Sequence, residues 1–160
     1  MRKDELLHAM GMELLLVVTV RKIPPDFIIG GADNPYLRRW FVRPEGASGG
    51  MYLHQILRDD DDRALHDHPW DSSVYIIHGA YEEVLTTGRT VYRAGSYRHM
   101  PAEQAHRLVV VEGPVWTLCF LGPRKREWGF HCPQGWVPWQ QFVSGRDKGQ
   151  IGAGCGDANP

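Results

Sequence analysis

The sequence predicts a single all-β domain, a barrel or sandwich of short strands that follows a short N-terminal helical or extended segment. Its 160 residues, 42% of them hydrophobic, suit one domain with a core large enough to fold without cross-links. Eighteen glycines and eleven prolines divide the middle of the chain into short segments. These segments are rich in Val, Ile, Tyr and Trp, which favour strands.

Residues 1–25 are expected to form an N-terminal extension. Its most apolar run is MELLLVVTV at 12–20, which contains a glutamate. Nine residues are too few to span a bilayer, for which about 20 are needed, and no small-residue cleavage site follows before Arg21. We therefore expect a helix or strand that packs on the domain, and no membrane association.

The predicted barrel covers residues 26–142. Short apolar segments separated by turn residues place its strands near 26–30, 36–42, 51–57, 64–68, 73–83, 90–93, 107–111 and 115–121, with a ninth around 128–131. The turns fall at 46–50, 59–62, 86–88, 112–114 and 122–124. Residues 143–160 are glycine-rich with few apolar side chains, which predicts a disordered tail.

The charge and the cysteines narrow the classes of partner and compartment. A net charge of −1 and a pI near 6.7 provide no basic patch for nucleic acid or an anionic membrane. The chain has three cysteines, an odd number, and no CxxC spacing: Cys119, Cys132 and Cys155. This argues against a disulfide framework and against a zinc site made of cysteines. We therefore expect a reducing cytoplasm and no binding to nucleic acid or other polyanions.

Three histidines form the main functional signal. In ALHDHPWDSS at 64–73, His66 and His68 are two residues apart and face the same side of a strand. In GSYRHMPAEQAHRLVVV at 95–111, His106 begins the next apolar strand after the turn around Pro101. Inside a small barrel the three imidazoles can converge on one divalent ion, and imidazole suits iron, zinc, copper and nickel.

These two stretches resemble the motifs of the cupin superfamily. The first cupin motif places HxH between two glycines and before a glutamate; here His66, His68 and Gly79 match it. The second motif is G, five residues, PxG, two residues and H, on which Gly95, Pro101 and His106 fall in register. The resemblance covers about 52–121 and implies a single-domain cupin-type β-barrel (jelly roll, or double-stranded β-helix) with one divalent metal bound by His66, His68 and His106.

The chain also departs from these motifs. Ser72 stands at the position of the usual glutamate ligand, Asp60 replaces the first glycine, Glu103 replaces the glycine of PxG, and Val110 stands where the motif has asparagine. A ligand set of three histidines without the glutamate resembles the iron sites of thiol dioxygenases and of diketone-cleaving dioxygenases. That resemblance favours Fe(II), with Zn, Ni, Mn and Cu as alternatives, and a dioxygenase-type oxidoreductase acting on a small chelating substrate. The runs LHDHPW, YLRRW and REWGFHCPQGW also resemble small bacterial and phage-associated cupin-like proteins of no assigned activity.

Two alternatives to the dioxygenase remain open, so the sequence does not decide whether the chain is an enzyme. A Lewis-acid isomerase or lyase would need a base, for which His54, Tyr97 and Glu103 are candidates. His54 alternates with Tyr52 and Ile56 on one face of a predicted strand. The other alternative is a non-catalytic ligand-binding cupin whose histidines serve structure.

Further residues have predicted supporting roles. Asp67, Asp71 or Ser72 could accept hydrogen bonds from the imidazole N–H groups. Arg98 could clamp a carboxylate, whereas alternation after His106 points Arg107 outward.

The remaining signals are read as structural. We expect the aromatic segment REWGFHCPQGWVPWQQF at 126–142 to cover an edge strand from the outside, or to form a homodimer surface. Within it, Cys132 is read as packing rather than as a nucleophile. The acidic run at 59–62 lacks the spaced ligands of a calcium loop and is read as a solvated turn.

Overall fold

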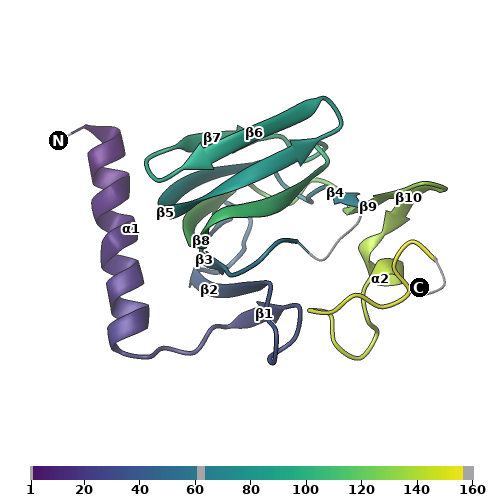
Figure 1. Ribbon diagram of the computed structural model, residues 1–160, viewed down its shortest axis with the longest axis horizontal. Helices are drawn as coiled ribbons and strands as arrows, with labels where there is room; N and C mark the ends of the chain where they lie inside the picture. The colour runs from purple at the N-terminus through teal and green to yellow at the C-terminus, as the bar shows by residue number, and fades with distance from the viewer. Residues whose placement is uncertain (1, 61–63, 157–160) are drawn as a thin grey trace.

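The computed structural model describes residues 2–60 and 64–156 (Figure 1). It confirms the all-β fold with an N-terminal helix. The elements are α1 (Lys3–Val20), β1 (Phe27–Ile29), β2 (Leu37–Arg43), β3 (Gly50–Ile56), β4 (Leu65–His66), β5 (Ser72–Leu85), β6 (Gly88–Arg93), β7 (Tyr97–Met100), β8 (His106–Leu121), β9 (Gly129–Cys132), β10 (Gly135–Pro138) and α2 (Trp139–Phe142). Part of the acidic run at 59–62, read above as a solvated turn, lies outside the described residues.

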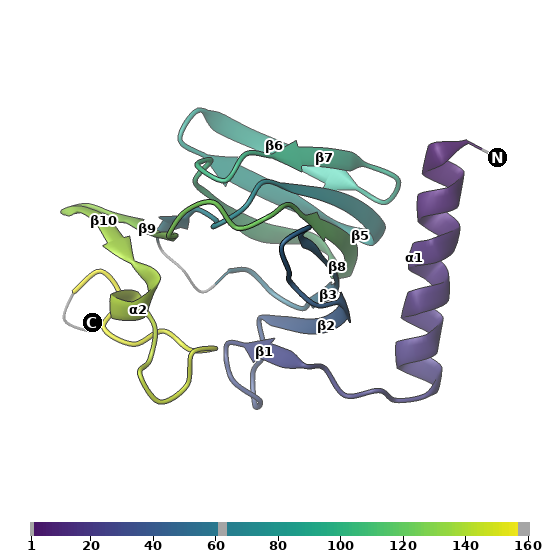
Figure 2. The ribbon, with the colours of Figure 1, turned by 180° about the vertical axis from the view of Figure 1, so that it is seen from behind.

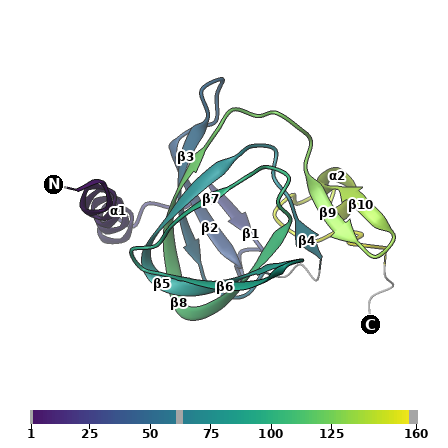
Figure 3. The same cartoon turned by 90° about the horizontal axis from the view of Figure 1, so that it is seen from above.

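The strands form one curled antiparallel sheet. β1, β2, β3 and β8 follow one another across it, and β5 pairs with β6, β7 and β8. Figure 3 looks into the resulting barrel and shows the strands curling around its interior. β8 is central to this arrangement, because it pairs with β3, β4 and β5.

The two strands predicted at 107–111 and 115–121 are a single strand, β8, and the glycine and proline at 113 and 114 do not end it. Both parts of β8 pair with β5, from Leu85↔His106 to Ser72↔Leu121. The register shifts around Gly79 of β5, whose φ is +79°. A Cβ at Gly79 would lie 2.5 Å from the Glu112 carbonyl oxygen, so the irregularity requires glycine there. The segment at 112–114 therefore lies opposite a bulge instead of forming a turn.

Helix α1 lies against the outside of the barrel, as the sequence predicted (Figures 1 and 2). Asp4 and Glu5 occupy its first turn, and a Glu5 carboxylate oxygen accepts a hydrogen bond from the Arg2 backbone N–H at 2.9 Å. Val18 packs in a cluster with buried side chains of β2, β3, β5 and β8, namely Trp40, Leu53, Tyr75, Ile77, Trp116 and Leu118. Neither described helix is long and apolar enough to cross a membrane.

The aromatic segment extends the sheet and does not lie across its outer face. β9 pairs with β4 through His66↔Phe130, and β10 pairs with β9. The Phe130 and Phe142 rings stack with centroids 3.6 Å apart, and Trp128 stacks on Trp139. The predicted covering of an edge is thus achieved by strand pairing. Figure 3 shows this unit on the side of the barrel opposite α1.

The C-terminal residues differ from what composition predicts. Cys132 is joined to Cys155 by a disulfide, which corrects the expectation of unpaired cysteines and removes the ground for expecting a reducing compartment. Over 143–156, where a disordered tail was expected, Val143 bridges Ile151, and Gly149 accepts a backbone hydrogen bond from Gly30. Neither a disulfide partner nor a distant backbone acceptor leaves a local sequence signal. The boundaries at 25 and 142 stay a prediction.

Thiol counting should reveal this cysteine pattern. Cys119 is buried, and burial raises the pKa of its thiol to about 11, so at pH 8 only about one molecule in 1,000 carries the reactive thiolate. We expect almost no reaction of the native protein with a chromogenic disulfide reagent, about one thiol after unfolding without reductant, and all three after reduction. Three thiols in the unfolded, unreduced protein would contradict the Cys132–Cys155 pairing.

Candidate metal centre

The structure brings together the three histidines that the sequence predicted as ligands. His66 ends β4, His68 follows it, and His106 begins β8 directly opposite His66. Each offers one ring nitrogen, and these three nitrogens lie within 4.8 Å of one another. The Nε2 atoms of His68 and His106 are 2.9 Å apart. This cluster could hold a metal ion.

The chemistry of the three side chains fits a divalent ion. Burial, followed by the neighbouring histidines, lowers the pKa of His106 well below its usual value, and burial with His66 and Arg39 does the same for His68. Neutral imidazoles present a lone pair, which is the form that binds metal. Two imidazole nitrogens on one ion, each bound at about 2.0–2.1 Å, lie roughly 3 Å apart, close to the separation of the Nε2 atoms.

Glu83, which the sequence analysis did not single out, orients His106. Its carboxylate accepts a hydrogen bond from His106 Nδ1 at 2.6 Å, which leaves Nε2 free to face the cluster. The same carboxylate forms a buried ion pair with Arg98 of β7. Burial raises the pKa of Glu83, and Arg98 opposes that shift. Glu83 and Arg98 are 1% and 5% exposed, so the pair is sealed from solvent.

The predicted hydrogen-bond acceptors for the other imidazoles are placed differently. Asp60, which was not among the predicted acceptors, approaches His66, with 3.4 Å between its Oδ2 and the Nδ1 of the histidine. Asp71 binds the Ala102 backbone N–H and Lys125 instead of an imidazole. Ser72 is buried in the wall of the site, and its Oγ has no hydrogen-bond partner among the described residues.

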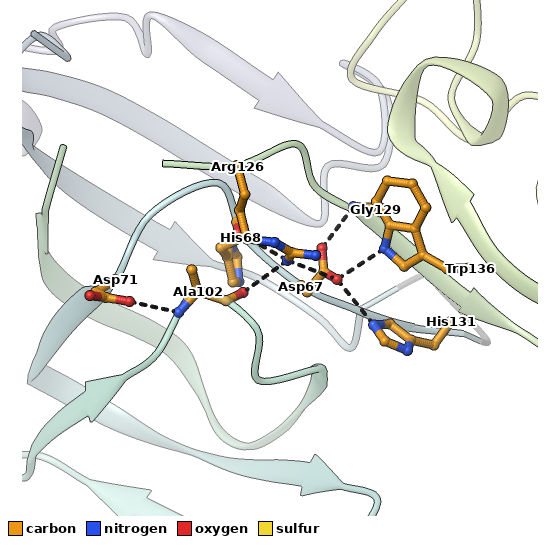
Figure 4. A network of polar contacts seen from close by, with 8 residues as sticks. All are labelled: Asp67, His68, Asp71, Ala102, Arg126, Gly129, His131 and Trp136. Atoms are coloured by element: carbon orange, nitrogen blue, oxygen red, sulfur yellow. Dashed lines mark hydrogen bonds and ion pairs between the residues drawn. The ribbon is translucent and has the colours of Figure 1, made fainter. Parts of the chain in front are cut away.

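Asp67, between His66 and His68, bonds residues of the β9–β10 hairpin (Figure 4). Successive strand residues face opposite sides, so an aspartate between two inward histidines faces outward. Its carboxylate accepts hydrogen bonds from the Gly129 backbone N–H at 2.8 Å and the Trp136 indole N–H at 3.0 Å. Arg126 and His131 lie 3.0 and 3.1 Å from the same carboxylate. The network fixes the segment that carries His66 and His68.

The histidines line a cavity of about 120 Å³ in the barrel. Much of its wall is apolar, with Leu37, Ile56 and Leu108 among the lining side chains. His54 also lines it, as alternation with Tyr52 and Ile56 predicted. Its Nε2 accepts a hydrogen bond from Arg39 Nε at 2.9 Å, and burial together with the Arg39 charge lowers the pKa of His54 well below its usual value.

The other sequence-predicted candidates lie elsewhere. Tyr97 is 49% exposed on the outside of the barrel, near Lys3 of α1, because Arg98 and Met100 are the β7 residues that face the cavity. Glu103 is exposed and contributes no ligand atom to the cluster. Arg98 faces inward as considered, but Glu83 already neutralises it, and Arg107 is not part of the lining.

Comparison with solved structures shows the fold. The DMSP lyase DddQ from Ruegeria pomeroyi is 17% identical, with a TM-score of 0.52 over 66% of this chain and 57% of that chain. An uncharacterized protein with a double-stranded β-helix domain from Klebsiella pneumoniae is 17% identical, with a TM-score of 0.50 over 64% of this chain and 90% of that chain. No protein-family model matches the sequence, and no curated protein matches it. The predicted double-stranded β-helix is thereby confirmed.

Proposed function

We propose that this chain, which has the double-stranded β-helix fold of the cupins, is an oxidoreductase of the dioxygenase type. It would bind one Fe(II) through His66, His68 and His106 and act on a small chelating substrate. The observation that carries the proposal is the ligand set in the cavity: the clustered imidazoles of His66, His68 and His106, with no carboxylate among the described lining residues. Three neutral ligands leave the full double charge on the ion, which when bound would supply positions for substrate and oxygen.

The surrounding residues support a role in holding and orienting a substrate. Glu83 fixes the ring of His106, and the Asp67 network fixes the β4 segment that carries the other two ligands. Much of the lining is apolar, which lowers the local dielectric and strengthens electrostatic contacts inside the cavity.

A Lewis-acid isomerase or lyase would need a side chain that acts as a base, and the described lining residues of this cavity are poorly suited to that role. His54 is the one predicted candidate that lines it, and its Nε2 lone pair is engaged by Arg39. Burial raises the pKa of Tyr81 and of Cys119, so both stay protonated at neutral pH. The arrangement therefore favours chemistry that starts from the metal over proton transfer by a side chain.

The first test is metal content. Protein purified without a histidine tag is analysed beside a His66→Ala/His106→Ala variant and a His99→Ala control, in which an exposed histidine outside the cluster is removed. We expect about one iron per chain in the wild type and the control, and none in the double variant. Equal metal content in all three proteins would place the metal elsewhere.

The second test separates the two kinds of chemistry. Oxygen uptake is measured with iron-loaded and zinc-loaded protein in the presence of small dithiols and diketones. Consumption with iron alone supports the oxidoreductase. Turnover with zinc and no oxygen consumption would contradict it and support Lewis-acid catalysis.

A further inference from the structure

The guanidinium of Arg39 is held rigidly at the wall of the cavity. Its Nε donates to His54 Nε2, and its Cζ lies 4.8 Å from the centre of the Tyr52 ring. The Tyr52 hydroxyl donates in turn to Glu45, which fixes that ring. One edge and one face of the guanidinium are therefore fixed by neighbours.

The rest of the guanidinium has no acceptor. Among residues 2–60 and 64–156, no hydrogen bond from the terminal nitrogens of Arg39 is present, and no carboxylate lies within ion-pair distance of them. The arginine fork carries two parallel N–H groups that match a carboxylate. Arg39 is half-buried, and the Glu45 carboxylate that bonds Tyr52 acts on it only from beyond ion-pair distance. An anion that pairs directly with the fork would therefore be stabilised there.

The charged side chains that line the cavity are positive. Arg39 and Arg98 are the charged lining residues, and Glu83 outside the lining neutralises Arg98. Arg39 is thus a lining cation without a directly paired carboxylate among the described residues, and a divalent ion at the histidines would add to its charge. The nearby carboxylates of Asp60 and Glu45 lie outside the lining. The interior of this cavity favours an anionic occupant.

A second polar group in the cavity also has no partner. Ser72 is 3% exposed and lines the cavity, and its Oγ has no hydrogen-bond partner among the described residues. A buried hydroxyl of this kind usually bonds to a ligand or a water molecule. The cavity therefore offers an unpaired charged fork and an unpaired hydroxyl within an otherwise largely apolar wall.

We propose that Arg39 binds the carboxylate of the substrate, with Ser72 as an additional hydrogen-bonding group, so that the substrate is a small aliphatic carboxylic acid. The apolar lining and the volume of about 120 Å³ suit a short carbon chain. That the other end of the substrate meets the metal rests on the proposed function; the carboxylate site itself does not.

Binding of butanoate and of its uncharged analogue butanamide tests the site. Calorimetry at pH 7 is run on the protein as purified and after metal loading, with the wild type, Arg39→Gln, Arg39→Lys and Arg38→Gln. Arg38 is the matched control, because it lies on the same strand, bonds Gln55 and does not line the cavity. Thermal melts and metal analysis of each variant verify folding and the metal site.

We expect butanoate to bind the wild type and Arg38→Gln alike, and butanamide to bind about 100-fold more weakly. The Arg39→Gln variant should bind butanoate more weakly by a similar factor and keep its metal. The affinity of Arg39→Lys for butanoate should lie between those of the wild type and Arg39→Gln. In the His66→Ala/His106→Ala variant, butanoate binding that persists without metal separates this site from the metal proposal. Equal binding of acid and amide, no binding of butanoate to the wild type, or an unchanged Arg39→Gln would overturn the inference.

Discussion

Replacing Glu83 with glutamine should lower the free energy of unfolding by about 3–5 kcal/mol, because it leaves the buried Arg98 guanidinium without a counter-charge. For a domain of this size that corresponds to a decrease in Tm of roughly 10 °C. The variant should also bind metal about 10–100-fold more weakly, since His106 loses the carboxylate that orients its ring. Thermal melts and metal titration measure the two effects.

The neighbouring residue provides the matched control. Glu82 precedes Glu83 on β5 and pairs with Arg89 at 3.0 Å on the exposed side of the strand. Exposed ion pairs contribute about 0–1 kcal/mol, so Glu82→Gln should change stability and metal affinity little. Similar losses in the two variants would show that Glu83 has no special role in the metal centre.

Replacing Asp67 with asparagine should have an effect of similar size. The amide turns an N–H donor toward groups that now donate to the carboxylate, among them Trp136 and Arg126. We expect a loss of about 3–5 kcal/mol in the free energy of unfolding. Thermal melts measure this loss, and metal titration should show a lower affinity because the segment that follows β4 loses its anchor.

Asp71→Asn is the control for this prediction. Asp71 is also an aspartate near the histidines, but its side chain is 38% exposed and pairs with Lys125. Its replacement should change the free energy of unfolding little and leave the metal affinity unchanged. A stable Asp67→Asn variant with normal metal binding would mean that the hairpin does not support the site.

The parts of the site that follow strand alternation and motif spacing could be predicted from the sequence. His66 and His68 face one side because they are two residues apart, and the spacing from Gly95 to His106 identified the third histidine. The inward position of His54 followed from its alternation with Tyr52.

Glu83 could not be found in this way, because a bulge interrupts the alternation. Ser72 and Val74 line the cavity at even positions of β5, whereas Tyr81 does so at an odd one. The register shift around Gly79 causes the change. Continuing the earlier alternation would have placed Glu82 inside and Glu83 outside.

Other missed features depend on partners that are distant in the chain. Arg39 has a local signal, since LRRWF puts one arginine on each face of β2, but only the fold shows which one faces the cavity. The acceptor role of Asp67 depends on Gly129 and Trp136, more than 60 residues away. Cys132, the last residue of β9, and Cys155 are likewise paired only when the C-terminal segment folds back onto that strand.

The position of β8 also has a consequence for the lifetime of the protein. His68 and His106 are 38 residues apart, and His106 reaches β4 only when β8 has paired with strands from the first half of the chain. Contacts so distant in sequence form late in folding, so partly folded chains lack the assembled ligand set. Metal would then bind the native state alone and shift the folding equilibrium by mass action. Metal supply would thus influence how many chains escape proteolysis.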